Sequence, residues 1–178
     1  MLLANNMIIG LLLFFFLFLA TIYSAPPIRL KATVFFDSLA NVLYLIPGVI
    51  GYYSTTNTFP SLVYLLAFTS WVMAMHVFSA IPDIHVDKKA KLYTTALFLG
   101  RKYALLYCAV LWGIFSLLIV QSFVLFPYTL LLFVYPLLPI VVLGNRIPLE
   151  TMYEFFPFIN SLIGFIFFVL IFVTKINA

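Results

Sequence analysis

Apolar residues occur in six long runs separated by short polar stretches, and this pattern sets the expected fold. The runs cover about Leu2–Ile22, Phe35–Tyr53, Leu62–Ala80, Tyr103–Val120, Tyr128–Leu143 and Phe155–Val173. A helix needs roughly 20 apolar residues to cross a bilayer, whereas strands of a membrane barrel alternate in polarity over about ten residues. The pattern therefore predicts an all-α integral membrane protein, with residues 1–178 forming one domain of about six transmembrane helices.

Composition excludes the soluble classes. Hydrophobic residues make up 66% of the chain and charged residues 8%, whereas a soluble domain is about one quarter charged. The nine basic residues are dispersed between apolar runs, which is typical of a membrane orientation signal and not of a nucleic-acid surface. The single cysteine, Cys108, lies inside an apolar run and forms no metal-binding pattern. We expect a lipid bilayer as the environment and no nucleic acid as a partner.

The distribution of charge predicts the topology. Eight of the nine basic residues fall around the connections that follow the first, third and fifth runs: Arg29, Lys31, Lys88, Lys89, Lys91, Arg101, Lys102 and Arg146. Only Lys175 belongs to the other side. The positive-inside rule then predicts a multi-pass cell-membrane protein whose charged side is cytoplasmic and whose two ends are external. All five acids lie on or near the same side, so we expect any chemistry there.

Two acids after the third run are candidate metal ligands. Asp83 and Asp87 are four residues apart, so on a helix both carboxylates would lie on one face. Mg²⁺ commonly takes one or two protein carboxylates and completes its shell with water and phosphate oxygens. The lysines that follow, Lys88 and Lys91 among them, would add positive charge for a phosphate ligand. The alternative is a solvated loop in which the acids balance these lysines.

The connection after the first run is a candidate anion-binding loop. Pro26 and Pro27 end the first helix and stiffen the chain that leaves it. Arg29 and Lys31 would then be held near the headgroups, where they could bind a diphosphate. The alternative is that the two residues only anchor the helix by the positive-inside rule.

Polar residues also enter the second and third runs. Asp37, Asn41 and Tyr44 follow one another at intervals of four and three, and we expect this stripe to line a cavity or another helix. The Pro47-Gly48 pair beyond it predicts a kink or local unwinding. His76 in the third run is a candidate metal ligand or base, with a helix–helix hydrogen bond as the alternative.

Three segments, Tyr23–Lys31, Phe36–Gly48 and Ser79–Arg101, together resemble the UbiA family of intramembrane prenyltransferases, particularly its branch of carotenoid (lycopene-type) elongases. The resemblance implies nine transmembrane helices around a central cavity, with two Asp-rich motifs that help to hold Mg²⁺ on a prenyl diphosphate. Asp83 and Asp87 match the second of these motifs. The loop with Arg29 and Lys31 matches the basic loop ahead of the family's fifth helix.

The resemblance implies an enzyme that transfers a prenyl group from an isoprenoid diphosphate to an apolar acceptor such as a carotenoid, a quinone precursor or a lipid. Mg²⁺ is the implied cofactor, with Asp83 and Asp87 as its catalytic ligands. The residues expected to bind diphosphate are Arg29, Lys31, Lys88 and Lys91. Those expected to line or orient the pocket are Tyr23, Asp37, Asn41, Tyr44 and His76.

Two departures from the family pattern shape these expectations. The family's first motif, N-x-x-x-D-x-x-x-D, is absent from the chain, and the six runs resemble helices four to nine. Lys91 stands where the family often has Gly or Asp. We therefore expect a partial domain, which is either a fragment, one half of a split enzyme whose missing helices a second chain supplies, or a degenerate copy. One alternative is an inactive copy that binds lipid or a partner. Another is a small transporter, but a transporter would be expected to carry a charge near the middle of the membrane, and no acid or base lies deep in a run.

Overall fold

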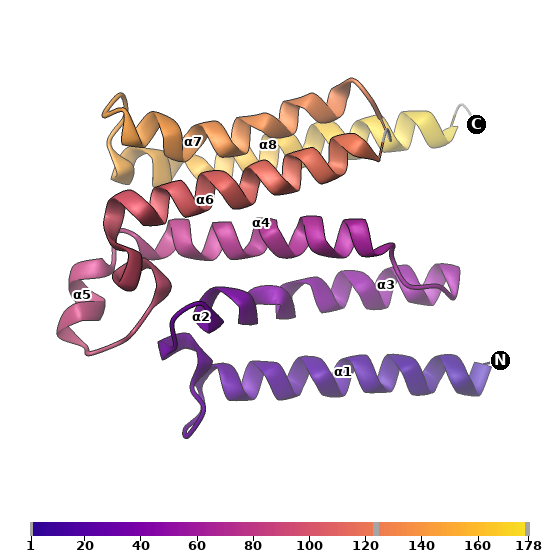
Figure 1. Cartoon of the computed structure of the whole chain (residues 1–178). Helices are drawn as coiled ribbons and strands as arrows, with labels where there is room; N and C mark the ends of the chain where they lie inside the picture. Colours follow the sequence, from indigo (N-terminus) through magenta and orange to yellow (C-terminus); the bar gives the residue numbers. More distant parts are fainter. Residues whose placement is uncertain (1, 123–124, 177–178) are drawn as a thin grey trace.

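The structure of the chain, a computed structural model, describes residues 2–122 and 125–176, and every regular element within these ranges is a helix. The helices lie side by side along one direction (Figure 1). Four of them are long and apolar enough to cross a membrane. These are α1 (Leu2–Ser24), α4 (Leu62–Ala80), α6 (Thr95–Gln121) and α8 (Leu149–Ile176). The predicted all-α membrane class is confirmed.

The bounds of the long helices follow their apolar runs with one informative difference. α4 coincides with the predicted third run, but α6 and α8 begin earlier than the fourth and sixth runs. Arg101 and Lys102 consequently lie on α6 and not in the loop where the sequence had placed them. Gly100, with φ 69° and ψ 163°, interrupts the helix immediately before these two cations. A conformation with positive φ carries no steric penalty for glycine, which explains the residue at the break.

The second apolar run is not one helix. It contains the short helix α2 (Phe36–Leu39), the 3₁₀ helix η2 (Ala40–Leu45) and helix α3 (Ile46–Thr56). The Pro47-Gly48 pair was expected to mark a kink or local unwinding, and the change of winding, in η2, ends just before this pair. Pro47 lies in the first turn of α3, where its missing N–H removes no helical hydrogen bond.

The fifth run is likewise divided, into the 3₁₀ helix η3 (Tyr128–Phe133) and helix α7 (Val134–Leu143). Together they match the predicted bounds, although they are shorter than a full span. Residues 123–124 of the loop that precedes them lie outside the described residues.

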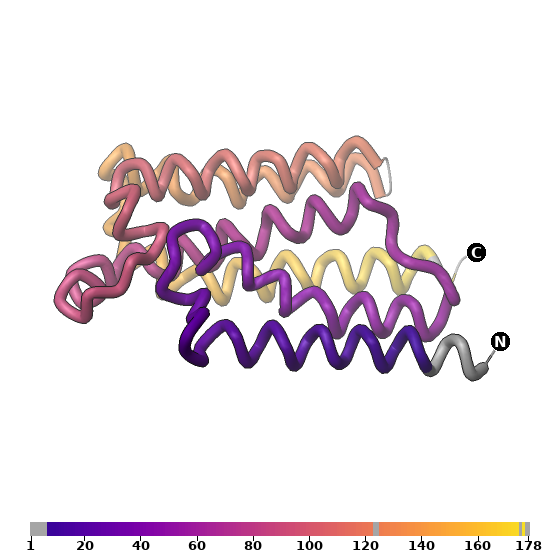
Figure 2. Tube along the Cα trace, turned by 60° about the horizontal axis from the view of Figure 1, so that its bottom comes forward, coloured from indigo at the N-terminus to yellow at the C-terminus, as the bar shows by residue number. Residues whose placement is uncertain are grey.

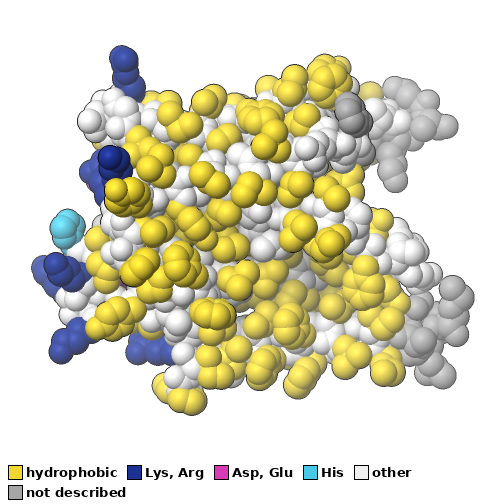
Figure 3. Space-filling view, in the orientation of Figure 1, with side chains coloured by type: hydrophobic (Ala, Val, Ile, Leu, Met, Phe, Trp, Pro, Cys, Tyr) yellow, Lys and Arg dark blue, Asp and Glu magenta, His cyan; other side chains and the backbone are white. Residues whose placement is uncertain are grey.

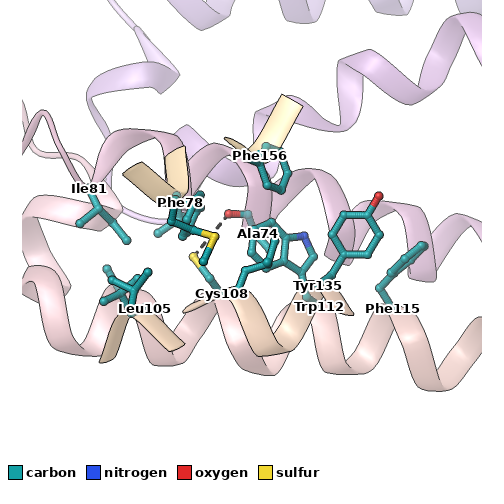
Figure 4. Packing of buried hydrophobic residues seen from close by; sticks show 14 of the residues in the cluster. Ala74, Phe78, Ile81, Leu105, Cys108, Trp112, Phe115, Tyr135 and Phe156 are labelled. Atoms are coloured by element: carbon teal, nitrogen blue, oxygen red, sulfur yellow. Dashed lines mark hydrogen bonds between the residues drawn. The ribbon is translucent and has the colours of Figure 1, made fainter. Parts of the chain in front are cut away.

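The core lies where α4, α6, α7 and α8 meet. Ala67, Ala74 and Ala104 are fully buried, and their small side chains let α4 and α6 approach each other closely, as is common in membrane helix pairs. Beside this contact, the buried Trp112 ring packs against Phe156 from α8, with ring centroids 5.5 Å apart. Tyr135 of α7 lies 5.9 Å from the Trp112 ring on another side (Figure 4). Aromatic packing thus joins α6 to both α7 and α8.

The charged residues gather at one end of the bundle. Figure 3 shows the Lys and Arg side chains at the end that carries the short helix α5 (Ile84–Lys89). The chain leaving α1 and the α4–α6 connection lie at this end in both views (Figures 1 and 2). α1 begins and α8 ends at the opposite end (Figure 1). The side chain of Lys175, expected at that opposite end, lies outside the described residues.

This arrangement predicts which positions share a side of the membrane. In a Cys108→Ala background, Lys89→Cys and Arg146→Cys should react with a membrane-impermeant maleimide from the same side of sealed vesicles. Thr56→Cys, at the end of α3, should react only from the other side. Labelling of Thr56→Cys and Lys89→Cys from one side would contradict the arrangement of the bundle.

Candidate functional site

The two acids predicted as metal ligands lie at the charged end, around the start of α5. Asp83 is the exposed residue before this helix, and Asp87 is half-buried within it. The backbone N–H of Asp87 donates to the carbonyl of Asp83 over 2.8 Å, so the two acids are one helical turn apart. Among the described residues, no lysine or arginine forms an ion pair with either carboxylate. The neighbouring lysines therefore form no direct ion pair with either acid in this part of the structure.

The chemistry of this acid pair fits Mg²⁺. Carboxylates are the hard oxygen ligands that Mg²⁺ prefers, and the ion typically needs only one or two of them beside water and phosphate. Within residues 2–122 and 125–176, no three or more His, Cys, Asp or Glu side chains are grouped in a way that could hold a metal ion. Zn²⁺ would require such a group, because it takes three or four protein ligands.

The basic residues occupy the same end of the molecule in two places. Lys88 and Lys91 are exposed and line a cavity of about 330 Å³, which Val34 lines as well. Val34 belongs to the chain that follows Arg29 and Lys31, so this cavity lies between the exit of the basic loop and the chain that joins α5 to α6. Arg29 is exposed and Lys31 half-buried, both at the 3₁₀ helix η1 (Leu30–Ala32). Neither of these two residues lines the cavity.

The Asp37 side chain is fully buried, and its carboxylate oxygens accept hydrogen bonds from other groups of the protein. Its Oδ2 accepts the backbone N–H of Thr95 over 2.8 Å, and its Oδ1 accepts the Thr95 hydroxyl. Oδ1 also accepts the backbone N–H of Ser38 over 2.8 Å. His76 Nε2 lies 3.7 Å from Asp37 Oδ2, so this histidine faces Asp37 on the neighbouring helix. The structure thus places His76 and Asp37 together in a contact between α2, α4 and α6.

The polar stripe of the second run is split by the 3₁₀ helix. Asn41 is buried, and its amide donates to the carbonyl of Asp37 over 2.6 Å. Tyr44 is 61% exposed and lines two cavities instead. A 3₁₀ helix has three residues per turn, so the side-chain direction departs from the spacing expected for an α-helix. Tyr23, at the end of α1, is half-buried near Asn41.

An aromatic groove runs between α4 and α8, and the sequence had not revealed it. It consists of two cavities of about 490 Å³ and 400 Å³ that share the lining residues Trp71 and Asn160. The smaller cavity reaches Ser79, near the charged end, and the larger one reaches Phe68 in the other direction along α4. Asn160 Oδ1 accepts the Tyr135 hydroxyl over 2.6 Å. A lone asparagine in a long apolar helix was the available signal, since such residues seldom face lipid.

Thr94 and Thr95, at the start of α6, were not among the site residues predicted from the sequence. Thr94 is the N-cap residue, whose hydroxyl accepts the N–H of Leu97 over 3.3 Å. The same hydroxyl donates to Asp87 Oδ2 over 3.0 Å. Threonine immediately before an apolar run is a common helix-start signal, so the capping role could have been found from the sequence. The contact with Asp87 could not.

Comparison with known proteins adds a family to this geometry. The UbiA prenyltransferase family matches residues 1–162. The chain is 41% identical over 145 residues to a lycopene elongase/hydratase of Haloarcula japonica, which covers 82% of the chain and 49% of that protein. It is 40% identical over 153 residues to a lycopene elongase/hydratase of Halobacterium salinarum, covering 84% of the chain and 54% of that protein.

A more distant relative, the lycopene elongase/hydratase of Corynebacterium glutamicum, is 32% identical over 101 residues, which cover 54% of the chain and 35% of that protein. The chain spans about half the length of the two more similar relatives. No solved structure matches it significantly.

The hydrogen bond between α7 and α8 at the wall of the groove predicts a measurable effect on stability. Tyr135→Phe removes the hydroxyl that reaches Asn160 and should lower the free energy of unfolding by about 0.6 kcal/mol, the average for such bonds between membrane helices. Reversible unfolding in bicelles measures this change. Tyr128→Phe, at a half-exposed tyrosine of η3, is the matched control and should have no effect. Equal losses in both variants would contradict a specific role for the Tyr135 hydroxyl.

Proposed function

Because the chain belongs to the UbiA prenyltransferase family, we propose that it forms part of an intramembrane enzyme that transfers a prenyl group from an isoprenoid diphosphate to an apolar acceptor. The observation that carries the proposal is the position of the acid pair, beside a cluster of cations and at one end of an aromatic groove. Prenyl transfer needs both surroundings, since it starts from a charged diphosphate and ends on an apolar molecule.

The charged end would bind the diphosphate. In this proposal Asp83 and Asp87 hold Mg²⁺, and Arg29, Lys31, Lys88 and Lys91 bind phosphate oxygens. Bound Mg²⁺ would supply the positive charge that stabilises the departing diphosphate. The cations contribute to the same stabilisation, because fixed positive charges act where negative charge develops. By the positive-inside rule this end faces the cytoplasm, where water-soluble isoprenoid diphosphates are accessible.

The groove would hold the apolar part of the reaction. Its α4 wall extends from Phe68 to Ser79, a rise of eleven steps or roughly 16 Å along the helix. Ser79 is four residues from Asp83, so a prenyl chain in the groove would have its diphosphate end near the acids. Aromatic ring faces such as that of Trp71 attract a cation, and exclusion of water protects it from hydrolysis.

A carotenoid is the acceptor that the relatives favour. Proteins named lycopene elongase/hydratase are 37–41% identical to the chain over most of its length. Lycopene-type polyenes are long and apolar, which agrees with the two adjoining cavities between α4 and α8. We propose this class of acceptor over quinone precursors or other lipids.

A complete site would need residues beyond those of this chain. The chain spans about half of its more similar relatives, and its acids at the charged end provide one pair of candidate ligands. We propose that the opposing carboxylates come from a further segment or a second polypeptide. Without it, the diphosphate would lack part of its charge neutralisation, and the groove would be open on one side.

The metal role of the acids predicts a large loss of rate. In the complete enzyme, Asp83→Asn and Asp87→Asn should each raise the activation free energy by about 3 kcal/mol, a loss of roughly a hundredfold, because a ligand of the stabilising ion is removed. Transfer of labelled prenyl diphosphate at limiting Mg²⁺ measures the effect. Glu150→Gln, an acid in the first turn of α8, is the control and should retain activity. Near-normal rates in both aspartate variants would relegate the acids to a solvated loop.

The proposed incompleteness predicts a second result. The purified 178-residue chain should show no detectable prenyl transfer with Mg²⁺, geranylgeranyl diphosphate and lycopene. Co-expression of a polypeptide that carries the N-x-x-x-D-x-x-x-D motif and its helices should restore activity, because it completes the metal site. Robust turnover by the chain alone would overturn this part of the proposal. A lack of turnover in every combination would favour the alternative of an inactive protein that binds lipid or a partner.

A further inference from the structure

Thr94 and Thr95, at the start of α6, form the same kind of contact with two different segments: each hydroxyl donates a hydrogen bond to an aspartate and accepts one from a backbone N–H. The Thr94 hydroxyl donates to Asp87 Oδ2 over 3.0 Å and accepts the N–H of Leu97. The Thr95 hydroxyl donates to Asp37 Oδ1 and accepts the N–H of Phe35 over 2.7 Å. Each hydroxyl therefore joins one carboxylate to one backbone amide, and both threonines are buried.

We propose that the Thr94-Thr95 pair is a positioning clamp that fixes the Asp87 carboxylate relative to the exit of the basic loop. Thr94 and Thr95 are positioning residues, and Asp37 is the buried anchor through which the clamp is held. The inference rests on the proposed function in one respect, namely that Asp87 binds a divalent cation. The hydrogen bonds themselves do not depend on it.

The anchor is rigid for an electrostatic reason. A carboxylate removed from water must have its oxygen atoms hydrogen-bonded, otherwise burial costs several kcal/mol. Asp37 has no exposed surface, and it meets this requirement with donors from its own helix and from Thr95, 58 positions away in the chain. Movement of the first turn of α6 would therefore break bonds to a buried charge. Thr95 is held in place by that cost.

Through its hydrogen bonds, the clamp fixes both the end of the basic loop and the Asp87 carboxylate relative to the start of α6. Phe35 comes four residues after Lys31, and its amide is bonded to the Thr95 hydroxyl, so the end of the basic loop is set by the clamp. On the other side, the chain between α5 and α6 turns through Lys91, which has φ 55°. This turn returns Thr94 to Asp87. Hydrogen bonds to metal-binding carboxylates orient them, and their loss typically weakens metal binding about 10–100-fold.

The test measures metal binding rather than turnover. Mn²⁺ serves as the spectroscopic probe for the Mg²⁺ site, and its free concentration is followed by electron paramagnetic resonance with the full chain in lipid nanodiscs. Thr94→Val, which keeps the shape and removes the hydroxyl, should weaken Mn²⁺ binding about 10–100-fold. Thr94→Ser should restore it. Thr129→Val is the matched control, because Thr129 is also buried but its hydroxyl has no hydrogen-bond partner among the described residues.

A double variant separates the clamp from the metal role. If Thr94 acts through Asp87, adding Thr94→Val to Asp87→Asn should weaken Mn²⁺ binding no further. Additive losses, or unchanged binding in Thr94→Val when Asp87→Asn weakens it, would overturn the clamp and leave the proposed metal site intact. Unchanged binding in Asp87→Asn, or no binding by the unmutated chain, would overturn the metal role on which the clamp's purpose rests.

A metal-free measurement tests the coupling itself. Asp37→Asn and Thr95→Val should each increase hydrogen–deuterium exchange both in the first turn of α6 and at residues 33–36, because the anchor holds these two segments together. Thr129→Val should leave both segments unchanged. Faster exchange confined to the mutated segment would contradict the clamp, whereas faster exchange throughout the bundle would indicate general unfolding and would also overturn it.

Discussion

The buried carboxylate of Asp37 is the constraint on which the arrangement of the charged end depends. It lies in an apolar bundle without exposed surface, and such a group is tolerated only when donors surround it. Thr95 supplies two of those donors, so α6 has to begin beside α2. The contact lies at the short helix α2, where the second apolar segment departs from one straight helix. His76, 3.7 Å from the same carboxylate, ties α4 to the contact.

The anchoring separates two chemical environments along the same helices. At the end where Asp37 is buried, Asp83 and the Lys and Arg side chains lie on the surface of the bundle, and Asp87 is half-buried beside them. Further along α6, Trp112 and its aromatic neighbours form a dry core beside the groove. Prenyl transfer requires a polar site for the diphosphate and a dry site for the cation within a few ångströms of each other. Under the proposed function, the charged end would hold the diphosphate and the aromatic groove the apolar part of the reaction.

The outer helices fit a chain that is surrounded by lipid or by further helices. No residue of Met7–Ser24 in α1 is buried, and only 11% of the spanning part of α8 is. Apolar side chains on such faces are at no disadvantage in a bilayer, because lipid is as apolar as they are. The same faces are therefore available to the half of the relatives' length that this chain does not match. The groove beside α8 is one place where such a segment could complete the wall.

The sequence by itself determined the membrane class, the helical segments and the end at which charge gathers. These properties depend on local composition, since a span needs a long apolar run and cations stay at its ends. The matching bounds of α4 show how far this reasoning extends. Only the tertiary structure decided that the buried Asp37 carboxylate is bonded to Thr95, and that Thr94 contacts Asp87. Such contacts join residues far apart in the chain or around a turn, and the energetic requirement to satisfy a buried charge, not periodicity, selects them.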